Sequence, residues 1–228
     1  RRGRLGSQHT TYAAPCLMWH DLTAKGFARI LTVVYATPIR RGECRLFARF
    51  PFQFSSPWPG RLLGLRPQWL QHLGNHVVLE DDQVFLHWQE RVLEQRGGSH
   101  TAVRSFHLPT SADLNIRALH DWVNRYGGEP FPGQPLPPRQ PLAPLMDRFE
   151  AHTRHCRSCS GAHRRLPQLR AVAGAVALLA LVVAGWCGPS WAGALALGGA
   201  AAAAAVRQQG QRWLDQLQRG SGLPPRNR

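Results

Sequence analysis

Two cysteines separated by two residues are the side chains of this sequence best suited to chemistry. Cys156 and Cys159 make a C-x-x-C pair, and no second pair with this spacing occurs in the chain. Thiols at this spacing can form a redox-active disulfide, or they can provide half of a zinc site that needs two further ligands. A redox switch, a zinc site and two unpaired thiols near a membrane surface are therefore the interpretations to be separated.

Three histidines close to the cysteine pair could complete a zinc site: His152, His155 and His163. Several arginines surround the pair, and positive charge favours the thiolate form that a redox disulfide requires. The chain has five cysteines in all, an odd and widely spread set that does not indicate the disulfide framework of a secreted protein.

A short acidic cluster is the second candidate, in a chain with few acidic residues. Glu80, Asp81 and Asp82 adjoin an apolar stretch that contains Leu86 and His87. The simpler interpretation is a helix N-terminus, where the helix dipole stabilises negative charge. The alternative is a carboxylate that binds iron together with two histidines. None of the local histidines lies at a paired spacing that we would assign to such a site: His9, His20, His72, His76 and His87.

Several well-known catalytic motifs do not occur in this sequence. It contains no G-x-S-x-G, no phosphate-binding P-loop and no dinucleotide-binding fingerprint. The C-x-H…C-x-x-H pattern of a Rieske [2Fe–2S] cluster is also not found.

The first half of the chain is expected to position these residues on a small sheet and on helices. Residues 27–35 and 44–52 are rich in β-branched and aromatic side chains and predict a β-hairpin around a turn at 38–42. A helix is expected to begin at Pro67, because proline suits the first helical turn. The apolar pattern over 77–93 fits either a second helix or the continuation of one bent helix.

The second half begins with another helix and a linker. Residues 110–126 predict an amphipathic helix with Ser111 as its N-cap, ended by the two glycines that follow. Residues 129–144 are rich in proline and predict either a linker or an arm that lies along the surface of the domain. Residues 145–165 look helical again and contain the cysteine pair.

Two uncharged apolar segments near the C-terminus predict a membrane hairpin. Residues 171–186 and 191–206 contain no charged side chain, and a Cys-Gly-Pro-Ser turn separates them. Each is somewhat shorter than the roughly 20 residues of a comfortable membrane span. Trp186 and Trp191 flank the turn, as aromatic residues do at a membrane interface. A buried helical hairpin in a soluble core is the alternative.

Charge predicts how this hairpin is oriented. Arg164, Arg165 and Arg170 precede its first half, while Arg207 and Arg212 follow its second half. Because basic residues favour the cytoplasmic side, both ends and the soluble domain are expected on the cytoplasmic or stromal side. The chain is therefore predicted to be a multi-pass membrane protein.

The strong positive charge of the chain does not predict nucleic-acid binding. Its formal net charge of +15 comes from scattered arginines, with Lys25 the only lysine. Nucleic-acid-binding proteins gather basic side chains into a patch or stripe. We therefore expect no nucleic-acid partner, and we expect basic residues to face anionic lipid headgroups.

Three segments resemble one protein family, in the order in which the family has them. They are the acidic segment 80–90, the helical segment 119–128 and the cysteine segment 147–160, which is followed by the apolar hairpin. Together they resemble the pheophorbide a oxygenase family, a branch of Rieske-type non-haem iron oxygenases that includes the Tic55-like proteins. The likeness runs from about Thr11 to the end of the chain, and the C-x-x-C segment with its hairpin is the most specific part.

The resemblance implies a fold and cofactors. The fold would be α+β: part of a helix-grip catalytic domain, with an antiparallel sheet and packed helices, followed by the two-helix transmembrane hairpin. Enzymes of this family use a Rieske [2Fe–2S] cluster and a mononuclear non-haem iron, and they oxygenate chlorophyll-derived tetrapyrroles with O₂. The match to the acidic segment of the family implies that Asp82 is the carboxylate ligand of the iron, with Asp81 as the fallback.

The resemblance also implies that part of the catalytic machinery lies elsewhere. The cluster ligands and the two iron-binding histidines of the family precede the matched region, so we expect a C-terminal fragment of a longer oxygenase that is inactive alone. Its expected partners are membrane lipid, a tetrapyrrole substrate, a ferredoxin or thioredoxin-like electron donor and further copies of itself. A photosynthetic membrane is the expected location.

These expectations divide the chain into consecutive parts. They are the oxygenase region 1–128, the linker 129–144, the cysteine segment 145–170, the transmembrane hairpin 171–206 and the basic tail 207–228. The expected function is that of a pheophorbide a oxygenase-like or chlorophyllide a oxygenase-like enzyme. The alternative is a non-enzymatic, membrane-bound redox sensor or assembly component that acts through Cys156 and Cys159.

Overall fold

The computed structural model describes residues 6–98 and 102–220. The chain divides into two compact units. We call Arg1–Arg66 with Phe85–Arg139 the sheet unit, and Pro67–Val84 with Gln140–Arg228 the hairpin unit. The start of the predicted region 1–128 and the end of the predicted tail 207–228 lie outside the described residues.

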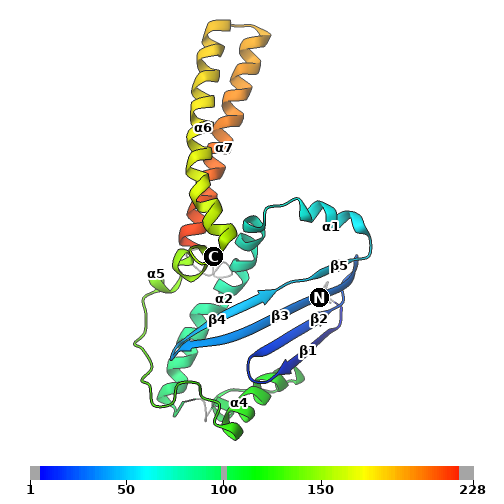
Figure 1. The fold of residues 1–228 in the computed structure, drawn as a ribbon, viewed down its shortest axis with the longest axis vertical. Helices are drawn as coiled ribbons and strands as arrows, with labels where there is room; N and C mark the ends of the chain where they lie inside the picture. Colours follow the sequence, from blue (N-terminus) through cyan, green and yellow to red (C-terminus); the bar gives the residue numbers. More distant parts are fainter. Residues whose placement is uncertain (1–5, 99–101, 221–228) are drawn as a thin grey trace. The chain divides into compact units, whose positions relative to one another are not determined.

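Within the described residues, the sheet unit holds one five-stranded antiparallel sheet (Figure 1). Its strands are β1 (Gln8–Ala13), β2 (Leu17–Leu22), β3 (Phe27–Arg40), β4 (Glu43–Arg49) and β5 (Phe52–Phe54). The first four lie in sequence order, and β5 pairs with β3 beyond the end of β4. The expectation of an α+β fold with an antiparallel sheet and packed helices is confirmed, while β1 and β2 were not predicted.

The predicted β-hairpin is present and longer than expected. β3 continues to Arg40, and Gly42 turns the chain with a φ of 76°. The register shifts between Pro38 and Arg40, because proline cannot donate a hydrogen bond to a neighbouring strand. Pro51 separates β4 from β5 for the same reason, while its carbonyl still accepts a hydrogen bond from the Leu31 N–H at 3.0 Å.

Short helices accompany the sheet. They are α1 (Pro57–Gly64), α3 (Ala102–Ser105), the 3₁₀ turn η2 (Ser111–Asp113) and α4 (Leu114–Tyr126). The helix predicted over 110–126 is therefore found, and Gly127 ends it in the left-handed conformation, as expected. The predicted cap is wrong: Ser111 lies inside η2, and the N–H and hydroxyl of Thr110 both donate to the Asp113 carboxylate.

The first part of the proline-rich segment is bound to the sheet unit. The guanidinium of Arg41 pairs with Glu129 and with Glu94. The guanidinium of Arg91 donates to the carbonyl of Pro137 at 3.1 Å. Residues 129–139 therefore lie along the sheet unit.

α2 (Gln68–Gln95) is one continuous helix. It begins directly after Pro67, as predicted, and the choice between two helices and one is resolved in favour of one. Its residues up to Val84 belong to the hairpin unit, and those from Phe85 onward belong to the sheet unit.

The hairpin unit is dominated by two long helices. α6 (Arg157–Cys187) and α7 (Trp191–Arg219) lie side by side as a hairpin (Figure 1). The short helix α5 (Leu142–Leu145) and the π-helical turn η3 (Phe149–Thr153) precede them. The helix expected over 145–165 is therefore interrupted, because α6 begins only at Arg157.

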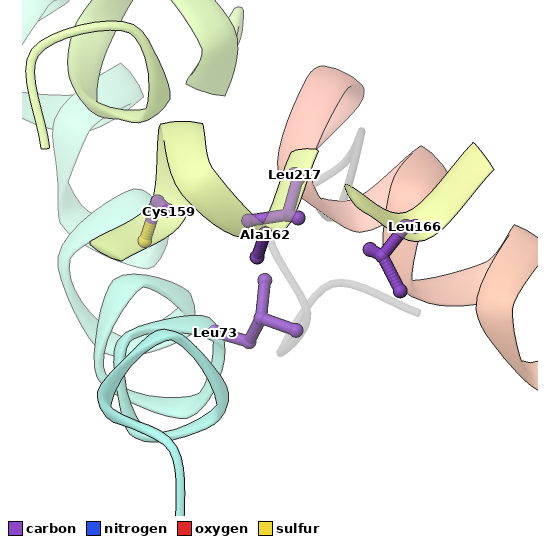
Figure 2. Close-up of a cluster of buried hydrophobic side chains, with 5 residues drawn as sticks. All are labelled: Leu73, Cys159, Ala162, Leu166 and Leu217. Carbon is purple, nitrogen blue, oxygen red and sulfur yellow. The ribbon is translucent and has the colours of Figure 1, made fainter. Parts of the chain in front are cut away.

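The core of the hairpin unit lies where α6 and α7 meet α2. Its buried side chains gather from these helices (Figure 2): Leu73, Cys159, Ala162, Leu166 and Leu217. At its margin the rings of Trp69 and Trp213 meet edge to face, with centroids 5.2 Å apart. One of the two candidate cysteines is thus part of a hydrophobic core.

Candidate functional site

Cys156 and Cys159 lie at the start of α6. Cys156 is the N-cap residue and has extended backbone angles, with φ −94° and ψ 119°. Cys159 lies in the first turn and is 1% exposed. Because three residues make most of a helical turn, this spacing brings the two thiols to one side of the helix. Both cysteines are free thiols in the structure.

Two histidines from other elements meet the cysteine pair. His72 comes from α2, and its Nδ1 lies 3.3 Å from the Sγ of Cys159 and 3.5 Å from the Sγ of Cys156. His152 comes from η3, and one ligand-type atom from each of the four side chains lies within 4.8 Å of the others. In the described part of the chain this is the one such group, and we call it the Cys-His cluster (His72, His152, Cys156 and Cys159).

Burial keeps the histidines around this cluster uncharged at neutral pH. It lowers the pKa of His72, and burial, followed by nearby His72 and Arg148, lowers the pKa of His152 to about 4. His76, one turn after His72, packs against His152 with ring centroids 4.0 Å apart. The pKa of His76 is lowered to about 3, chiefly by burial. A neutral imidazole keeps one lone pair for a metal or a hydrogen-bond donor.

The other two histidines proposed as zinc ligands lie outside the cluster. His155 is exposed, and its Nε2 accepts a hydrogen bond from Arg154 at 3.0 Å. The Nε2 of His163 lies 3.0 Å from the side-chain amide of Gln218. Of the three histidines near the cysteines in sequence, the structure therefore brings only His152 into the group of ligand-type atoms.

His72 is the member of the cluster that sequence reasoning missed. It precedes Cys159 by 87 residues, so no local pattern joins the two. Its spacing to His76, four residues later, places two imidazoles on one face of a helix. That spacing is the signal that could have identified it.

A buried ion pair lies close to the cluster in sequence and braces the same elements. Arg148 donates from Nε and Nη2 to the two carboxylate oxygens of Glu80, each at 2.6 Å. Its Nη1 also donates to the carbonyl of Gln216 at 3.0 Å. The hydroxyl of Thr153 donates to the carbonyl of Leu217 at 2.6 Å. These bonds join α2, the segment around η3 and the end of α7.

The acidic cluster lies inside α2 and not at its start. The helix begins at Gln68, about three turns before Glu80, so the helix N-terminus interpretation is wrong. Asp81 is 6% exposed, whereas Asp82 is exposed to solvent. Neither belongs to a group of three ligand-type side chains in the described residues. These residues do not form a two-histidine, one-carboxylate iron site by themselves, and Asp82 as an iron ligand stays a prediction.

Among the described residues, α6 is the one helix long and apolar enough to cross a membrane. α7 does not pass the same test, because its apolar half consists largely of alanine and glycine. Trp186 and Trp191, on either side of the turn, are 90% and 80% exposed. The two-helix span therefore stays a prediction for α7.

Comparisons with known proteins point to one family. Residues 12–100 match the family described as pheophorbide a oxygenase. Among curated proteins, the chain is 30% identical over 178 residues to protochlorophyllide-dependent translocon component 52, chloroplastic, of Arabidopsis thaliana. That match covers 74% of this chain and 30% of the relative.

Two further relatives extend this pattern. Flavonoid 8-hydroxylase 2, chloroplastic, of Ocimum basilicum is 29% identical over 159 residues, which are 68% of this chain and 29% of the relative. Pheophorbide a oxygenase, chloroplastic, of Arabidopsis thaliana is 28% identical over 155 residues, which are 58% of this chain and 28% of the relative. The chain thus spans less than a third of the curated relatives it matches. No solved structure matches it.

Proposed function

Because this chain is a relative of the pheophorbide a oxygenases, we propose that it is part of a membrane-bound Rieske-type oxygenase. The enzyme would act with O₂ on a chlorophyll-derived tetrapyrrole such as pheophorbide or chlorophyllide. The observation that carries this proposal is the family match over residues 12–100, which covers strands β2 to β5 and the whole of α2. The chloroplast location in the names of the relatives supports a photosynthetic membrane.

Iron and a Rieske cluster supply O₂ activation and electrons in this family. We propose Asp82 as the carboxylate ligand of the iron, with Asp81 as the fallback. The exposure of Asp82 supports this order, since its carboxylate is accessible to an ion while that of Asp81 is buried. The histidine ligands would have to come from outside the group of ligand-type side chains that the structure brings together.

A membrane anchor would suit an apolar substrate. Large apolar side chains point outward over much of α6, including Leu178, Leu179 and Val182, each at least 66% exposed. Exposed apolar surface of this extent favours a lipid environment. Arginines at the base of both helices favour the cytoplasmic or stromal side for that end. The hairpin would thereby hold the enzyme where a tetrapyrrole dissolves.

Electron donors and copies of the chain are the remaining proposed partners. A ferredoxin would supply electrons to the oxygenase, and a thioredoxin-like protein would act on the cysteine pair. A homo-oligomer is proposed for the assembled enzyme.

A membrane-bound redox sensor or assembly component is the second candidate function. It is favoured by one observation: the sulfur atoms of Cys156 and Cys159 lie within 4.8 Å of one another. Cys159 is buried in the hairpin core, and Cys156 packs against that core while only partly buried. Such a protein would cycle between two thiols and a disulfide without changing a pigment.

The experiment uses the protein in its native membranes. Membranes receive pheophorbide a or chlorophyllide a, reduced ferredoxin and O₂, and pigments are separated by chromatography. Time-dependent, O₂-dependent conversion of one pigment, lost in membranes without this gene, supports the oxygenase. Membranes that leave every pigment unchanged while the cysteine pair still responds to thioredoxin would favour the sensor.

A further inference from the structure

We propose that the Cys-His cluster binds one zinc ion through His72, His152, Cys156 and Cys159. The proposal does not depend on the oxygenase function, because all four side chains belong to the hairpin unit. They come from three elements: α2, η3 and the start of α6. No other group of three or more ligand-type side chains occurs in the described residues.

The kinds of atom in the cluster select the metal. Two thiolate sulfurs with two imidazole nitrogens are the ligand set of structural zinc sites. The cluster contains no carboxylate, so it does not suit magnesium, calcium or manganese, which prefer oxygen. Glu80, the nearby carboxylate, is already engaged by two hydrogen bonds from Arg148.

The charge balance suits a buried position. Binding of Zn²⁺ forms two zinc–sulfur bonds and releases the two thiol protons of Cys156 and Cys159 to solvent. Two thiolates cancel the charge of the ion, and the imidazoles are neutral. A neutral complex places no net charge beside the apolar core that Cys159 shares with Leu73 and Leu217.

Distances between ligand atoms fit a tetrahedral site. With zinc–sulfur bonds of about 2.3 Å and zinc–nitrogen bonds of about 2.0 Å, a nitrogen and a sulfur of one tetrahedron lie about 3.5 Å apart. His72 Nδ1 lies 3.3 Å from Cys159 Sγ and 3.5 Å from Cys156 Sγ. Two edges of the tetrahedron are therefore already formed. The remaining pairs, all within 4.8 Å, would have to close by about 1.5 Å at most to reach tetrahedral separations.

One nitrogen of the cluster lacks the partner that burial demands. Nε2 of His152 is buried, and within the described residues it has no hydrogen-bond partner. Buried polar atoms without a partner are uncommon and cost free energy. A zinc ion bound through Nε2 of His152 would supply the missing partner.

The ion would act as a cross-link at the base of the hairpin. The chain segments it joins lie far apart in sequence, because His72 and Cys156 are 84 positions apart. It would fasten α2 and η3 to the first turn of α6. Oxidation of the two thiols to a disulfide would remove both sulfur ligands, so bound zinc and the disulfide exclude one another.

Zinc and cobalt binding to the purified full chain in detergent test the proposal. The reduced protein is stripped with a chelator and titrated with ZnCl₂, and bound zinc is measured by elemental analysis. Binding of about one zinc per chain is expected. With Co²⁺ in place of zinc, thiolate-to-cobalt charge-transfer bands and intense visible bands of tetrahedral cobalt should appear.

Matched variants keep the test specific. Cys156→Ser, Cys159→Ser, His72→Asn and His152→Asn should each lower zinc affinity at least tenfold, whereas His155→Asn and Cys187→Ser should bind zinc like the wild type. Reduced wild-type protein that binds no zinc would overturn the proposal. So would cobalt spectra without thiolate bands, or undiminished zinc affinity in the two Cys→Ser variants. The wild-type measurements decide the question even if a variant fails to fold.

Discussion

The guanidinium of Arg148 forms two hydrogen bonds of 2.6 Å with the carboxylate of Glu80. Both residues are nearly withdrawn from water, at 3% and 5% exposed. Arg148 stands just before η3, which contributes His152, and Glu80 stands on α2, two turns after His72. This pair therefore sets the position of the two elements that bring histidines to the cysteines.

Glu80→Gln tests how much this ion pair contributes to the free energy of unfolding. The substitution keeps the shape of the side chain but leaves the Arg148 charge buried without its counter-charge, so we expect a loss of about 3 kcal/mol in unfolding free energy. Thermal and chemical unfolding of the detergent-solubilised protein measures it. Glu150→Gln is the control, because its pair with Arg154 is about half exposed. Equal stability of the two variants would contradict the assignment.

Gly193 is expected to tolerate no side chain. A Cβ at this position would stand 2.3 Å from the carbonyl oxygen of Gly188, a backbone atom that cannot swing away. Gly193→Ala should therefore lower stability by about 1–3 kcal/mol, although alanine normally favours a helix. Gly198→Ala and Gly199→Ala are the controls on the same helix, since a Cβ there meets nothing within 4 Å. If Gly193→Ala is at least as stable as the controls, the close approach of the Gly188 carbonyl oxygen to position 193 is contradicted.

The metal-free hairpin unit should lose stability in mild acid. The pKa of His76 is lowered to about 3 and that of His152 to about 4, so the folded state binds protons less readily than the unfolded chain. The stabilising contribution is present above about pH 6.5 and is lost as the pH falls towards about 4. His72, His152 and Arg148 face His76 and all act in the same direction.

The unfolding temperature between about pH 7 and pH 4.5 measures this effect in the chelated protein. His76→Phe removes one of the two groups and should show a smaller decline than the wild type. An identical decline in the two proteins would assign the acid sensitivity to other groups.

Zinc should protect Cys156 from alkylation. In the zinc-loaded protein, Cys156 should react with a maleimide at least ten times more slowly than after chelation, because a metal-bound sulfur is a poor nucleophile. Cys159 is buried in the hairpin core and is not used as a reporter. Cys44, which is exposed and outside the cluster, serves as the internal control and should react equally in both states. Mass spectrometry of the labelled peptides gives the rates. Protection that persists after the metal has been removed would point to burial alone.

Asp82→Ala should reduce the iron content of the oxygenase. Iron retained by the protein isolated from membranes is measured by elemental analysis, and we expect most of the mononuclear iron to be lost. Asp121→Ala, another exposed aspartate, is the control. Full iron occupancy in Asp82→Ala with loss in Asp81→Ala would move the assignment to the fallback, and full occupancy in both variants would remove it.

Much of the fold followed from local patterns. The β3–β4 hairpin, the start of α2 after Pro67, α4 with its glycine stop and the paired apolar helices are all signalled by residues close together in sequence. β1 and β2 were not predicted, because polar residues interrupt the apolar pattern expected of a strand. β1 reads QHTTYA, and β2 contains His20 and Asp21. Pairing with β3 stabilises them, and such long-range pairing leaves little trace in a short segment.

The candidate site could be predicted only in part from the sequence, because one of its residues is brought in by a contact between distant segments. Cys156, Cys159 and His152 lie within eight residues and could be grouped by spacing. His72 joins them only because α2 packs against the start of α6, a contact made through core side chains such as Leu73. The acidic cluster was placed at a helix start because α2 was not recognised as one long helix.

Oxygen-18 labelling tests the central claim, that this chain belongs to a tetrapyrrole oxygenase. Membranes containing the protein are incubated with pheophorbide a or chlorophyllide a under ¹⁸O₂ in ordinary water, and the mass of the product is measured by mass spectrometry. We expect a product that carries oxygen from ¹⁸O₂ and that forms only when the protein is present. A product labelled solely from water, or a pigment recovered unchanged with iron-loaded protein, would contradict it.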